Sequence, residues 1–322
     1  MAAAVETLAP QVESYRAELV IAEGGSTDNT DEVLAQLRGR FPWIRVVANP
    51  GGHPATGLNR AICATRADVI IRVDAHTRYS PDFIESSLRA LAAHPQSAVG
   101  GPQSARGNTS FGRAVATAMQ SRLGVGPASF RHSKERRAVD TVYLGAYRRE
   151  LAFHLGGYRA FPSRAGEDAD FYRRARDAGF RIFVDPSIRS TYLPRETPSA
   201  LAKQSYRYGV AKAEIFHHSR GFPSWRPLAP LLLTTATAAS VFPRPRARLR
   251  ARVLLVPGWL SLLFLAGRRA DSLPQRLQFV GAAALMQYGY GIGLLVGLLR
   301  GRRRTKPLSG LAAGWCPGDS HP

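Results

Sequence analysis

The feature that most constrains the fold is a run of mostly β-branched residues, from Val69 to Val73, that leads into the pair Asp74 and His76. Such a run predicts a buried parallel strand that ends at Asp74. Ligands of open α/β sheets bind beyond the carboxyl ends of the strands. Because alternate residues of a strand share a face, the two side chains are expected to point the same way and could hold one divalent cation. An aspartate that only accepts hydrogen bonds from a turn is the alternative.

Helical and extended segments alternate along the first 185 residues. Apolar residues at helical spacing from Val5 to Tyr15 predict an opening helix. The segments expected after it are strands at 19–22, 44–48, 98–100 and 181–184 and helices at 31–38, 81–93 and 199–218. A further helix leads from the glycine-rich loop 49–57 into the strand that ends at Asp74. The order β-α-β-α-β predicts parallel strands and a doubly wound sheet.

The formal net charge of +21 is concentrated in the last third of the chain. Residues 221–322 contain 14 Arg or Lys and 2 acidic residues, whereas residues 1–220 contain 30 and 21. The basic residues of the last third flank apolar runs and do not interleave with exposed aromatic residues. This pattern favours anionic lipid headgroups as partners and argues against nucleic acid.

Residues 277–299 form an uncharged run that would be about 34 Å long as a helix, enough to cross a bilayer core. The shorter runs 227–243 and 253–267 are compatible with short spans, a re-entrant hairpin, interfacial helices or buried soluble helices. Arginines crowd every connector, which favours keeping most connectors on the cytoplasmic side. We therefore predict a globular domain over 1–220, membrane-associated helices over 221–306 and a disordered tail over 307–322.

The cysteines Cys63 and Cys316 are far apart and have no CxxC or Cys/His spacing. They predict neither a disulfide framework nor a zinc site, which suits a reducing cytosol. Residues 1–17 lack the basic and apolar regions of a secretory signal.

Five short motifs follow one another along the first 215 residues. They are Glu23-Gly-Gly-Ser-Thr-Asp28, Asp74-Ala-His76, Gly156-Gly-Tyr158, Gly166-Glu-Asp168 and Gln204-x-x-Arg207-Tyr208. This ordered set resembles the family 2 glycosyltransferases, and most of all the membrane-associated, succinoglycan-type glucosyltransferases of bacterial exopolysaccharide assembly. The resemblance implies the GT-A fold, an α/β architecture with a Rossmann-like, mostly parallel sheet.

The resemblance implies that Asp74 is the first residue of the family's Asp-x-Asp motif, with His76 in place of the second aspartate. The two residues would bind the divalent cation that stabilises the leaving diphosphate of a nucleotide sugar. An imidazole ligand suits Mn²⁺ better than Mg²⁺, so Mn²⁺ is the expected cation.

The resemblance also implies that Asp168 is the general base for the acceptor hydroxyl, with Glu167 as its neighbour. One base without a second carboxylate as nucleophile implies a single displacement with inversion. Two acids at the start of a helix also interact favourably with the helix dipole, and this plainer explanation stays open.

On the donor side, the resemblance places Glu23, Ser26, Asp28 and Asn59 beside the nucleotide sugar, together with the metal-binding aspartate. A capping loop explains Ser26 and Asp28 equally well, and a helix-surface position explains Asn59. His53 is the basic residue at hand for the diphosphate.

On the acceptor side, Gln204, Arg207 and Tyr208 resemble the Gln-x-x-Arg-Trp motif of membrane synthases. Arginine and glutamine one helical turn apart can clamp phosphate and sugar hydroxyls while the aromatic ring stacks on a sugar. The resemblance adds Gly157 and Tyr158 to this side. An amphipathic helix on the membrane surface, and glycines that only form a turn, are the alternatives.

Together these residues imply an inverting, metal-dependent hexosyltransferase at the cytoplasmic face of the membrane. Its donor would be a nucleotide sugar, expected to be UDP-linked, and its acceptor a lipid-linked saccharide. A polyprenyl-phosphate glycosyl synthase differs only in the acceptor. An inactive nucleotide-sugar-binding protein is the third possibility, because the chain lacks the Val-Ile-Pro-x-x-Asn strand that lies centrally in the family's sheet.

Overall fold

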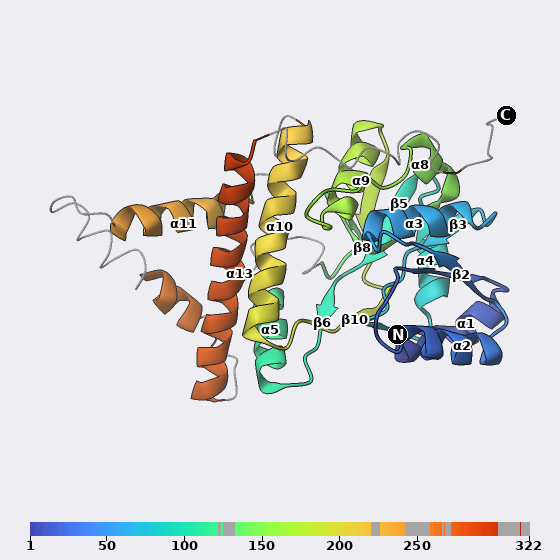
Figure 1. The fold of residues 1–322 in the computed structure, drawn as a ribbon, viewed down its shortest axis with the longest axis horizontal. Coiled ribbons are helices and arrows are strands. Elements are labelled where there is room, and N and C mark those ends of the chain that lie inside the picture. The colour runs from blue at the N-terminus through green and yellow to red at the C-terminus, as the bar shows by residue number, and fades with distance from the viewer. Residues whose placement is uncertain are drawn as a thin grey trace. The chain divides into compact units, whose positions relative to one another are not determined.

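The computed structural model describes residues 1–121, 124, 133–219, 226–241, 258–265, 267, 272–301 and 316. The chain divides into two compact units, whose helices and strands are drawn in Figure 1. The first unit contains Met1–Ser104, Ser133–Tyr192 and Pro307–Pro322, and the second contains Ala105–His132 and Leu193–Lys306. The predicted domain boundary at residue 220 differs from this division, because 105–132 and 193–219 belong to the second unit. Apart from Cys316, the tail predicted to be disordered lies outside the described residues.

The described strands are β1 (Leu19–Glu23), β2 (Ile44–Ala48), β3 (Val69–Ile71), β4 (Thr77–Tyr79), β5 (Ser97–Gly101), β6 (Ser104–Ala105), β7 (Arg137–Ala138), β8 (Tyr143–Arg148), β9 (Arg181–Val184) and β10 (Ser190–Tyr192). The strands predicted from sequence are present in the predicted order, whereas β4, β6, β7, β8 and β10 were not predicted. β1 and β2 pair in parallel, and a separate group has the order β3-β8-β5-β9-β7. The predicted α/β class is confirmed. The described sheet is mixed, however, because β8 runs antiparallel to both β3 and β5, and β7 runs antiparallel to β9.

β1 and β3 are less enclosed than the centre of the sheet. Each pairs with a single neighbour among the described strands. Most side chains of β1 and all of those of β3 are half-buried, whereas every residue of β5 is buried.

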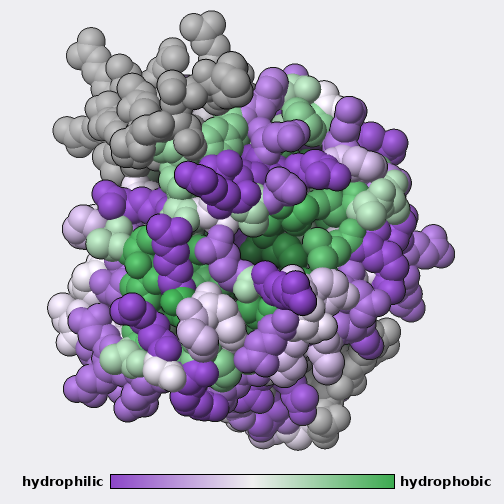
Figure 2. Space-filling view, turned by 90° about the vertical axis from the view of Figure 1, so that its right-hand side faces the viewer, coloured by the Kyte–Doolittle hydropathy of each residue, from purple (hydrophilic) through white to green (hydrophobic). Residues whose placement is uncertain are grey.

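Figure 2 shows apolar side chains in a hollow on one face of the molecule, surrounded by a hydrophilic rim.

The prediction that β3 continues to Asp74 is wrong. The strand ends at Ile71, and Arg72 N makes one more bond to Gly145 O before the chain turns. Thr77 N then donates to Asp74 O at 3.2 Å, and β4 pairs antiparallel with β10. The chain therefore leaves the sheet early, because the backbone of Asp74 bonds within a turn. The alternation rule of a strand no longer places Asp74 and His76 on one face.

Helices cover both faces of the sheet in the first unit. They are α1 (Ala2–Ser14), α2 (Thr30–Arg40), α3 (Pro54–Cys63), α4 (Phe83–Ala92), α8 (Arg149–His154) and α9 (Glu167–Asp177). Residues of α3, α8 and α9 share one core cluster with Ile182 of β9. Residues of α1 and α4 share another with Phe183, the next residue of the same strand. Because neighbouring strand residues point to opposite faces, the sheet is a buried middle layer.

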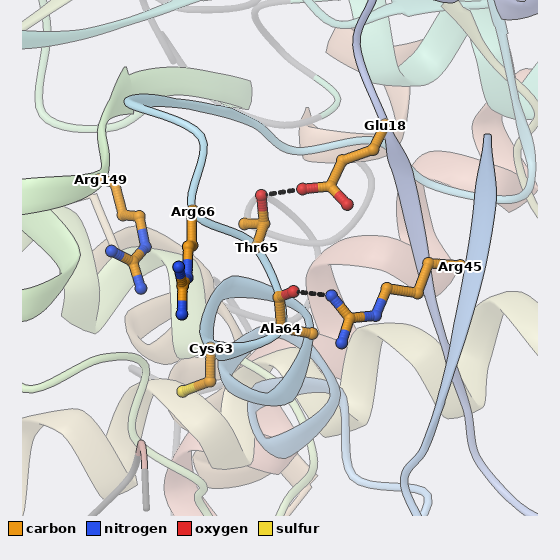
Figure 3. Close-up of a pocket in the computed structure, with 7 residues that line it drawn as sticks. All are labelled: Glu18, Arg45, Cys63, Ala64, Thr65, Arg66 and Arg149. Carbon is orange, nitrogen blue, oxygen red and sulfur yellow. Dashed lines mark hydrogen bonds between the residues drawn. The ribbon is translucent and has the colours of Figure 1, made fainter. Parts of the chain in front are cut away.

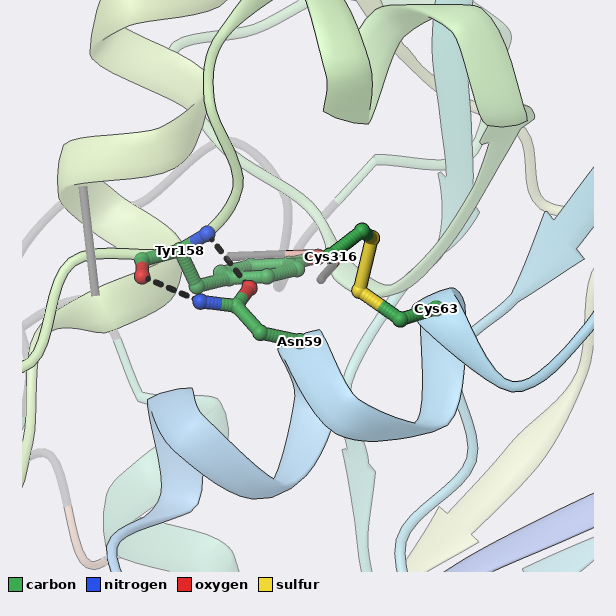
Figure 4. The surroundings of a disulfide bond; sticks show 4 residues. All are labelled: Asn59, Cys63, Tyr158 and Cys316. Atoms are coloured by element: carbon green, nitrogen blue, oxygen red, sulfur yellow. Dashed lines mark hydrogen bonds between the residues drawn. A yellow bond between two sulfur atoms is a disulfide. The ribbon is translucent and has the colours of Figure 1, made fainter. Parts of the chain in front are cut away.

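The prediction that the chain has no disulfide is wrong, because Cys63 at the end of α3 is bonded to Cys316 (Figure 4). The two cysteines are 253 residues apart in sequence and their Cα atoms are 5.3 Å apart. Spacing along a chain cannot reveal such a pair, since only the fold brings the two residues together.

The second unit is helical, with α5 (Ser110–Gln120), α10 (Pro198–Ser219), α11 (Leu228–Val241) and α13 (Leu273–Leu299). α10 and α13 pack with their backbones in close approach. A Cβ atom on Gly209 would lie 2.1 Å from Tyr290 O, and one on Gly293 would lie 2.0 Å from Tyr206 O. Glycine is therefore required at both positions.

α13 is the one helix among the described residues that is long and apolar enough to cross a membrane. It has 27 residues and includes the predicted run 277–299, and only a third of its apolar window is buried. Leu277, Ile292 and Leu299 are exposed on it. The run 227–243 contains α11, and 253–267 is described as helix over 258–265. The arginine-rich connectors 244–252 and 302–306 lie outside the described residues.

Candidate active site

Asp74 is held by its backbone in the turn between β3 and β4. Tyr79 Oη accepts a hydrogen bond from Asp74 N at 2.6 Å and donates one to Asp74 O at 2.9 Å. Burial raises the pKa of Tyr79, so its hydroxyl keeps its proton. Tyr143 Oη, 2.6 Å from Thr77 Oγ1, holds the other end of the turn. The turn presents the Asp74 carboxylate from a backbone that is bonded on both sides.

Arg72 joins this turn to the start of α9. Its Nε lies 3.4 Å from Asp74 Oδ1 and its Nη2 lies 3.2 Å from Glu167 Oε1, with 16 % of the side chain exposed. Burial opposes the charge of the guanidinium, but Asp74 and Glu167 raise the pKa of Arg72 above its ordinary value. No function was predicted for Arg72 from the sequence. Its position could have indicated an ion pair, because a charged residue inside an apolar strand requires a partner.

Glu167 and Asp168 occupy the first turn of α9, directly after Gly166, whose φ of 81° is favourable for glycine. Glu167 is buried, which raises its pKa, while the charge of Arg72 opposes the rise. Asp168 is only half-buried, and its Oδ1 accepts from Ala169 N at 2.7 Å. Of the two carboxylates, Glu167 is paired with Arg72 and Asp168 is the more accessible. The assignment of Asp168 as the general base stays a prediction.

His76 lies at the exposed part of the same turn as Asp74. Its ring meets the ring of Tyr192 edge to face, with the centroids 5.3 Å apart. Within the described ranges, no third Asp, Glu, His or Cys joins these residues in a cluster that could hold a metal ion. A carboxylate and an imidazole still fit a divalent cation whose remaining ligands are phosphate oxygens and water.

The loop after β1 is organised by its own carboxylates. Glu23 accepts from Gly25 N at 2.8 Å and from Ser26 N at 2.7 Å, and these bonds lower its pKa. Asp28 accepts from the hydroxyl and the backbone N–H of Thr30, which lowers its pKa. Both side chains are therefore charged at neutral pH. The assignment of Glu23, Ser26 and Asp28 to the nucleotide stays a prediction.

Asn59 and Tyr158 hold two segments together and do not face a ligand. Asn59 Nδ2 donates to Tyr158 O at 2.9 Å, and Tyr158 N donates to Asn59 Oδ1 at 2.8 Å (Figure 4). Both side chains are buried, and the Tyr158 hydroxyl bonds to that of Tyr147. Gly157 O accepts from Arg174 of α9 at 2.7 Å. These contacts correct the direct binding functions predicted for Asn59 and Tyr158, because their polar atoms are used within the protein.

His53 is likewise structural. Its Nδ1 accepts from Ala55 N at the start of α3, its Nε2 bonds to Phe161 O at 2.8 Å, and burial lowers its pKa. The basic group near this loop is Arg164, which donates to Gly52 O. A Cβ atom on Gly24 would lie 3.1 Å from Gly52 Cα, so the Arg164 guanidinium is close to the loop after β1. Sequence reasoning missed Arg164, because 112 residues separate it from Gly52.

Gln204, Arg207 and Tyr208 lie on α10 of the second unit. Arg207 and Tyr208 are exposed. Their predicted contact with the acceptor stays a prediction.

Comparison with known proteins identifies the family. The family model described as Glycosyl transferase family 2 matches residues 1–154. Succinoglycan biosynthesis protein ExoA of Rhizobium meliloti (strain 1021) is 30% identical over 314 residues, which cover 97% of this chain and 86% of the relative. The chain belongs to glycosyl transferase family 2. This family 2 glycosyltransferase carries Asp74 on the turn after β3 and two adjacent acids, Glu167 and Asp168, at the start of α9.

Two further similarities agree with this membership. A Methanococcus voltae glycosyltransferase, dolichyl N-acetyl-alpha-D-glucosaminyl phosphate 3-beta-D-2,3-diacetamido-2,3-dideoxy-beta-D-glucuronosyltransferase, is 25% identical over 61% of this chain and 63% of its own length. The solved mannosyltransferase PcManGT from Pyrobaculum calidifontis, in complex with GDP-Man and Mn²⁺, matches with a TM-score of 0.55. That structure is 18% identical and covers 92% of this chain and 84% of the other. The predicted GT-A fold is confirmed.

Proposed function

We propose that this family 2 glycosyltransferase is an inverting, metal-dependent enzyme of exopolysaccharide or cell-envelope glycan synthesis. It moves a hexose from a nucleotide sugar, UDP-linked, to a lipid-linked saccharide. The observation that carries the proposal is Arg72, whose guanidinium contacts both Asp74 and Glu167. Through Arg72, the Asp74 carboxylate, which is predicted to bind the metal, is connected to the acid pair at the start of α9.

Each group has a task in a single displacement. Asp168 takes the proton of the acceptor hydroxyl as the hydroxyl attacks the anomeric carbon, and the bond from that carbon to the diphosphate breaks. Asp74 and His76 would hold a divalent cation, Mn²⁺ in preference to Mg²⁺, which would supply positive charge to the leaving diphosphate. Arg164 adds a fixed positive charge beside the loop after β1. The contacts of Arg72 with Glu167 and Asp74 keep the acid pair and Asp74 in place.

The second unit supports a membrane location. α13 is long enough to span the bilayer and exposes leucine and isoleucine side chains along its length. Membrane attachment, with the first unit facing the cytoplasm, would raise the effective concentration of a lipid-linked acceptor at the active site. Gln204, Arg207 and Tyr208 of α10 are the residues proposed to contact that acceptor.

The test is sugar transfer by membranes that contain the chain. With Mn²⁺ and labelled UDP-hexoses, label should move into the lipid-extractable fraction, while GDP-mannose should transfer none. Asp74→Asn and Asp168→Asn should each lose about 100-fold or more of this activity. Asp177→Asn is the matched control, because Asp177 lies exposed in the last turn of the same helix as Asp168. Binding of UDP by the intact chain without any transfer would overturn the proposal.

A further inference from the structure

A cavity of about 470 Å³ lies at the start of β3, whereas the Asp74 turn follows the end of that strand (Figure 3). Its walls include Glu18, which precedes β1, and Thr65 and Arg66, which precede β3. The Thr65 hydroxyl donates to the Glu18 carboxylate, so these two groups bond to each other within the protein. The cavity is therefore separate from the candidate active site, and the support for the acid pair lies around α9.

A fully buried carboxylate lies in the first turn of α9, beside the acid pair. Asp170 is 0 % exposed, and the reaction proposed above gives it no task. A charge that is removed from water requires partners of opposite charge. Three arginines contact Asp170: Arg174 Nε lies 2.8 Å from Oδ2, and Arg173 Nη2 and Arg159 Nη1 lie 3.2 Å and 3.8 Å from Oδ1. Arg174 makes the shortest of these contacts and is itself buried, so Asp170 fixes the position of its guanidinium.

Arg174 uses the rest of its guanidinium on the loop 155–158, which follows α8. Its Nη1 donates to Leu155 O at 2.6 Å, and its Nη2 donates to Gly157 O at 2.7 Å. One side chain therefore bonds to a carboxylate of α9 and to two carbonyl groups of the loop. The planar fork of an arginine can reach three such acceptors at once, whereas the ammonium of a lysine is a single point of charge.

Other contacts hold the loop 155–158 in the same place. Gly156 and Gly157 have φ angles of 64° and 73°, which favour glycine. Gly157 N donates to Ala152 O of α8 at 2.8 Å. The ring of Tyr158 stacks on that of Phe171 in α9, with the centroids 4.2 Å apart and the planes at 17°. The loop and α9 are therefore joined both by the polar contacts of Arg174 and by stacked rings.

The predicted base lies close to this loop. Burial raises the pKa of Tyr158, and the charge of Asp168 also raises it. The pKa of Tyr172 is raised by the same two causes. Because the interaction between charges falls with distance, the Asp168 carboxylate lies near the hydroxyl groups of both tyrosines. A shift of α9 against the loop would therefore move Asp168 relative to these groups.

We propose that Arg174, held by Asp170, is a positioning residue that fixes Asp168 relative to the loop 155–158. The proposal rests on the function proposed above, in which Asp168 takes the proton of the acceptor hydroxyl. Such a base must lie within hydrogen-bond reach of the proton, and a small displacement of a reacting group greatly slows the reaction. Donor binding is assigned to the Asp74 turn and the loop after β1. Loss of the Arg174 contacts should therefore lower kcat and leave the donor KM unchanged.

The test compares Arg174→Lys with Arg173→Lys. Breaking a buried ion pair is costly, so a neutral residue at position 174 could prevent folding. Both lysine variants keep a positive charge for Asp170. Arg173 is the matched control, because it is the neighbouring residue and bonds to Asp170 and Asp177, both of which belong to α9. Only Arg174→Lys removes a fork that is shared with the loop.

Sugar transfer by membranes that contain each variant gives the first readout. With Mn²⁺ and a range of UDP-hexose concentrations, Arg174→Lys should lower kcat about tenfold or more at an unchanged donor KM. Arg173→Lys should leave both constants close to those of the wild-type chain. Equal losses of kcat in the two variants, or a change confined to the donor KM, would overturn the proposal.

Hydrogen exchange gives a second readout that needs no sugar transfer. In the full chain in detergent, Arg174→Lys should speed exchange in peptides that cover the loop 155–158 and the first turn of α9, and Arg173→Lys should not. Unchanged exchange in Arg174→Lys, or faster exchange at an unchanged kcat, would contradict the positioning function. If the wild-type chain transfers no sugar, the proposed function fails, and the exchange data show separately whether Arg174 joins α9 to the loop.

Discussion

Arg72 and Glu167 form an ion pair of 3.2 Å between residues that are 95 positions apart in sequence. The same guanidinium contacts Asp74, so one side chain joins the turn after β3 to the first turn of α9. Asp74 lies on the turn after β3, and Glu167 lies in the first turn of α9. A cation held by Asp74 and a proton taken by Asp168 would therefore depend on one largely buried arginine.

Arg72→Gln is expected to reduce both stability and activity. Loss of a largely buried charge partner should lower the free energy of unfolding by about 2 to 4 kcal/mol. Loss of this positioning group should lower kcat/KM by about 10- to 100-fold and weaken the apparent affinity for Mn²⁺. Urea unfolding and Mn²⁺-dependent activity measure the two effects. Arg72→Lys should recover part of the stability, because it keeps the charge.

Arg89→Gln provides the comparison for that variant. Arg89 pairs with Glu85 at 3.7 Å on the exposed face of α4, and both side chains are more than half exposed. A surface pair of this kind contributes less than about 1 kcal/mol. Equal losses in Arg89→Gln and Arg72→Gln would show that Arg72 has no special function.

The pH dependence of stability tests the environment of Glu167. Burial raises its pKa above the ordinary value of 4.5. Its contribution to stability is therefore full below pH 4.5 and is lost as the pH rises through the pKa of the folded state. Glu167→Gln cannot ionise, so its free energy of unfolding should increase relative to that of the wild-type chain between pH 4.5 and 7.5. The opposite slope would mean that Arg72 outweighs burial and holds this pKa below 4.5.

The order of elements could be predicted from sequence, whereas the ends of some elements could not. β2 and β9 begin and end where periodicity places them, because their limits are local features such as flanking turns and helix ends. β3 ends three residues before Asp74, because Tyr79 bonds to the Asp74 backbone and a turn replaces the strand. That bond depends on the position of a side chain five residues later, which no pattern of hydrophobicity reports.

Prediction of the candidate site from the sequence has the same limit. The motifs predicted that Asp74, Glu167 and Asp168 act in one reaction, and Arg72 brings the first two of them together. Asn59 was expected at the nucleotide, but its partner, Tyr158, is 99 residues away. An amide beside a glycine-rich loop looks the same in sequence whether it binds a ligand or a distant backbone. Only the fold separates these possibilities.

Tyr79→Phe tests the clamp on the Asp74 backbone. The variant leaves the half-buried N–H of Asp74 without its partner and removes one of the two hydrogen bonds to Asp74 O, so stability should fall by about 1 to 3 kcal/mol. A less ordered Asp74 should also weaken the apparent affinity for Mn²⁺ in the transfer assay. Tyr147→Phe is the control, because it removes a buried hydroxyl bonded to Tyr158 and should lower stability without changing the Mn²⁺ dependence. A change in Mn²⁺ dependence of equal size in both variants would contradict the clamp.

Arg164→Ala tests whether Arg164 supplies the positive charge predicted for His53. Arg164 is exposed, so its removal should alter stability by less than about 1 kcal/mol. Loss of a charge-assisted contact to the diphosphate should raise the KM for the nucleotide sugar by about tenfold, equivalent to about 1.4 kcal/mol, with a smaller change in kcat. His53→Asn should instead act on stability, because His53 caps α3 and bonds to Phe161 O. If His53→Asn raised the donor KM at unchanged stability while Arg164→Ala did not, the histidine first expected from sequence would be the diphosphate ligand after all.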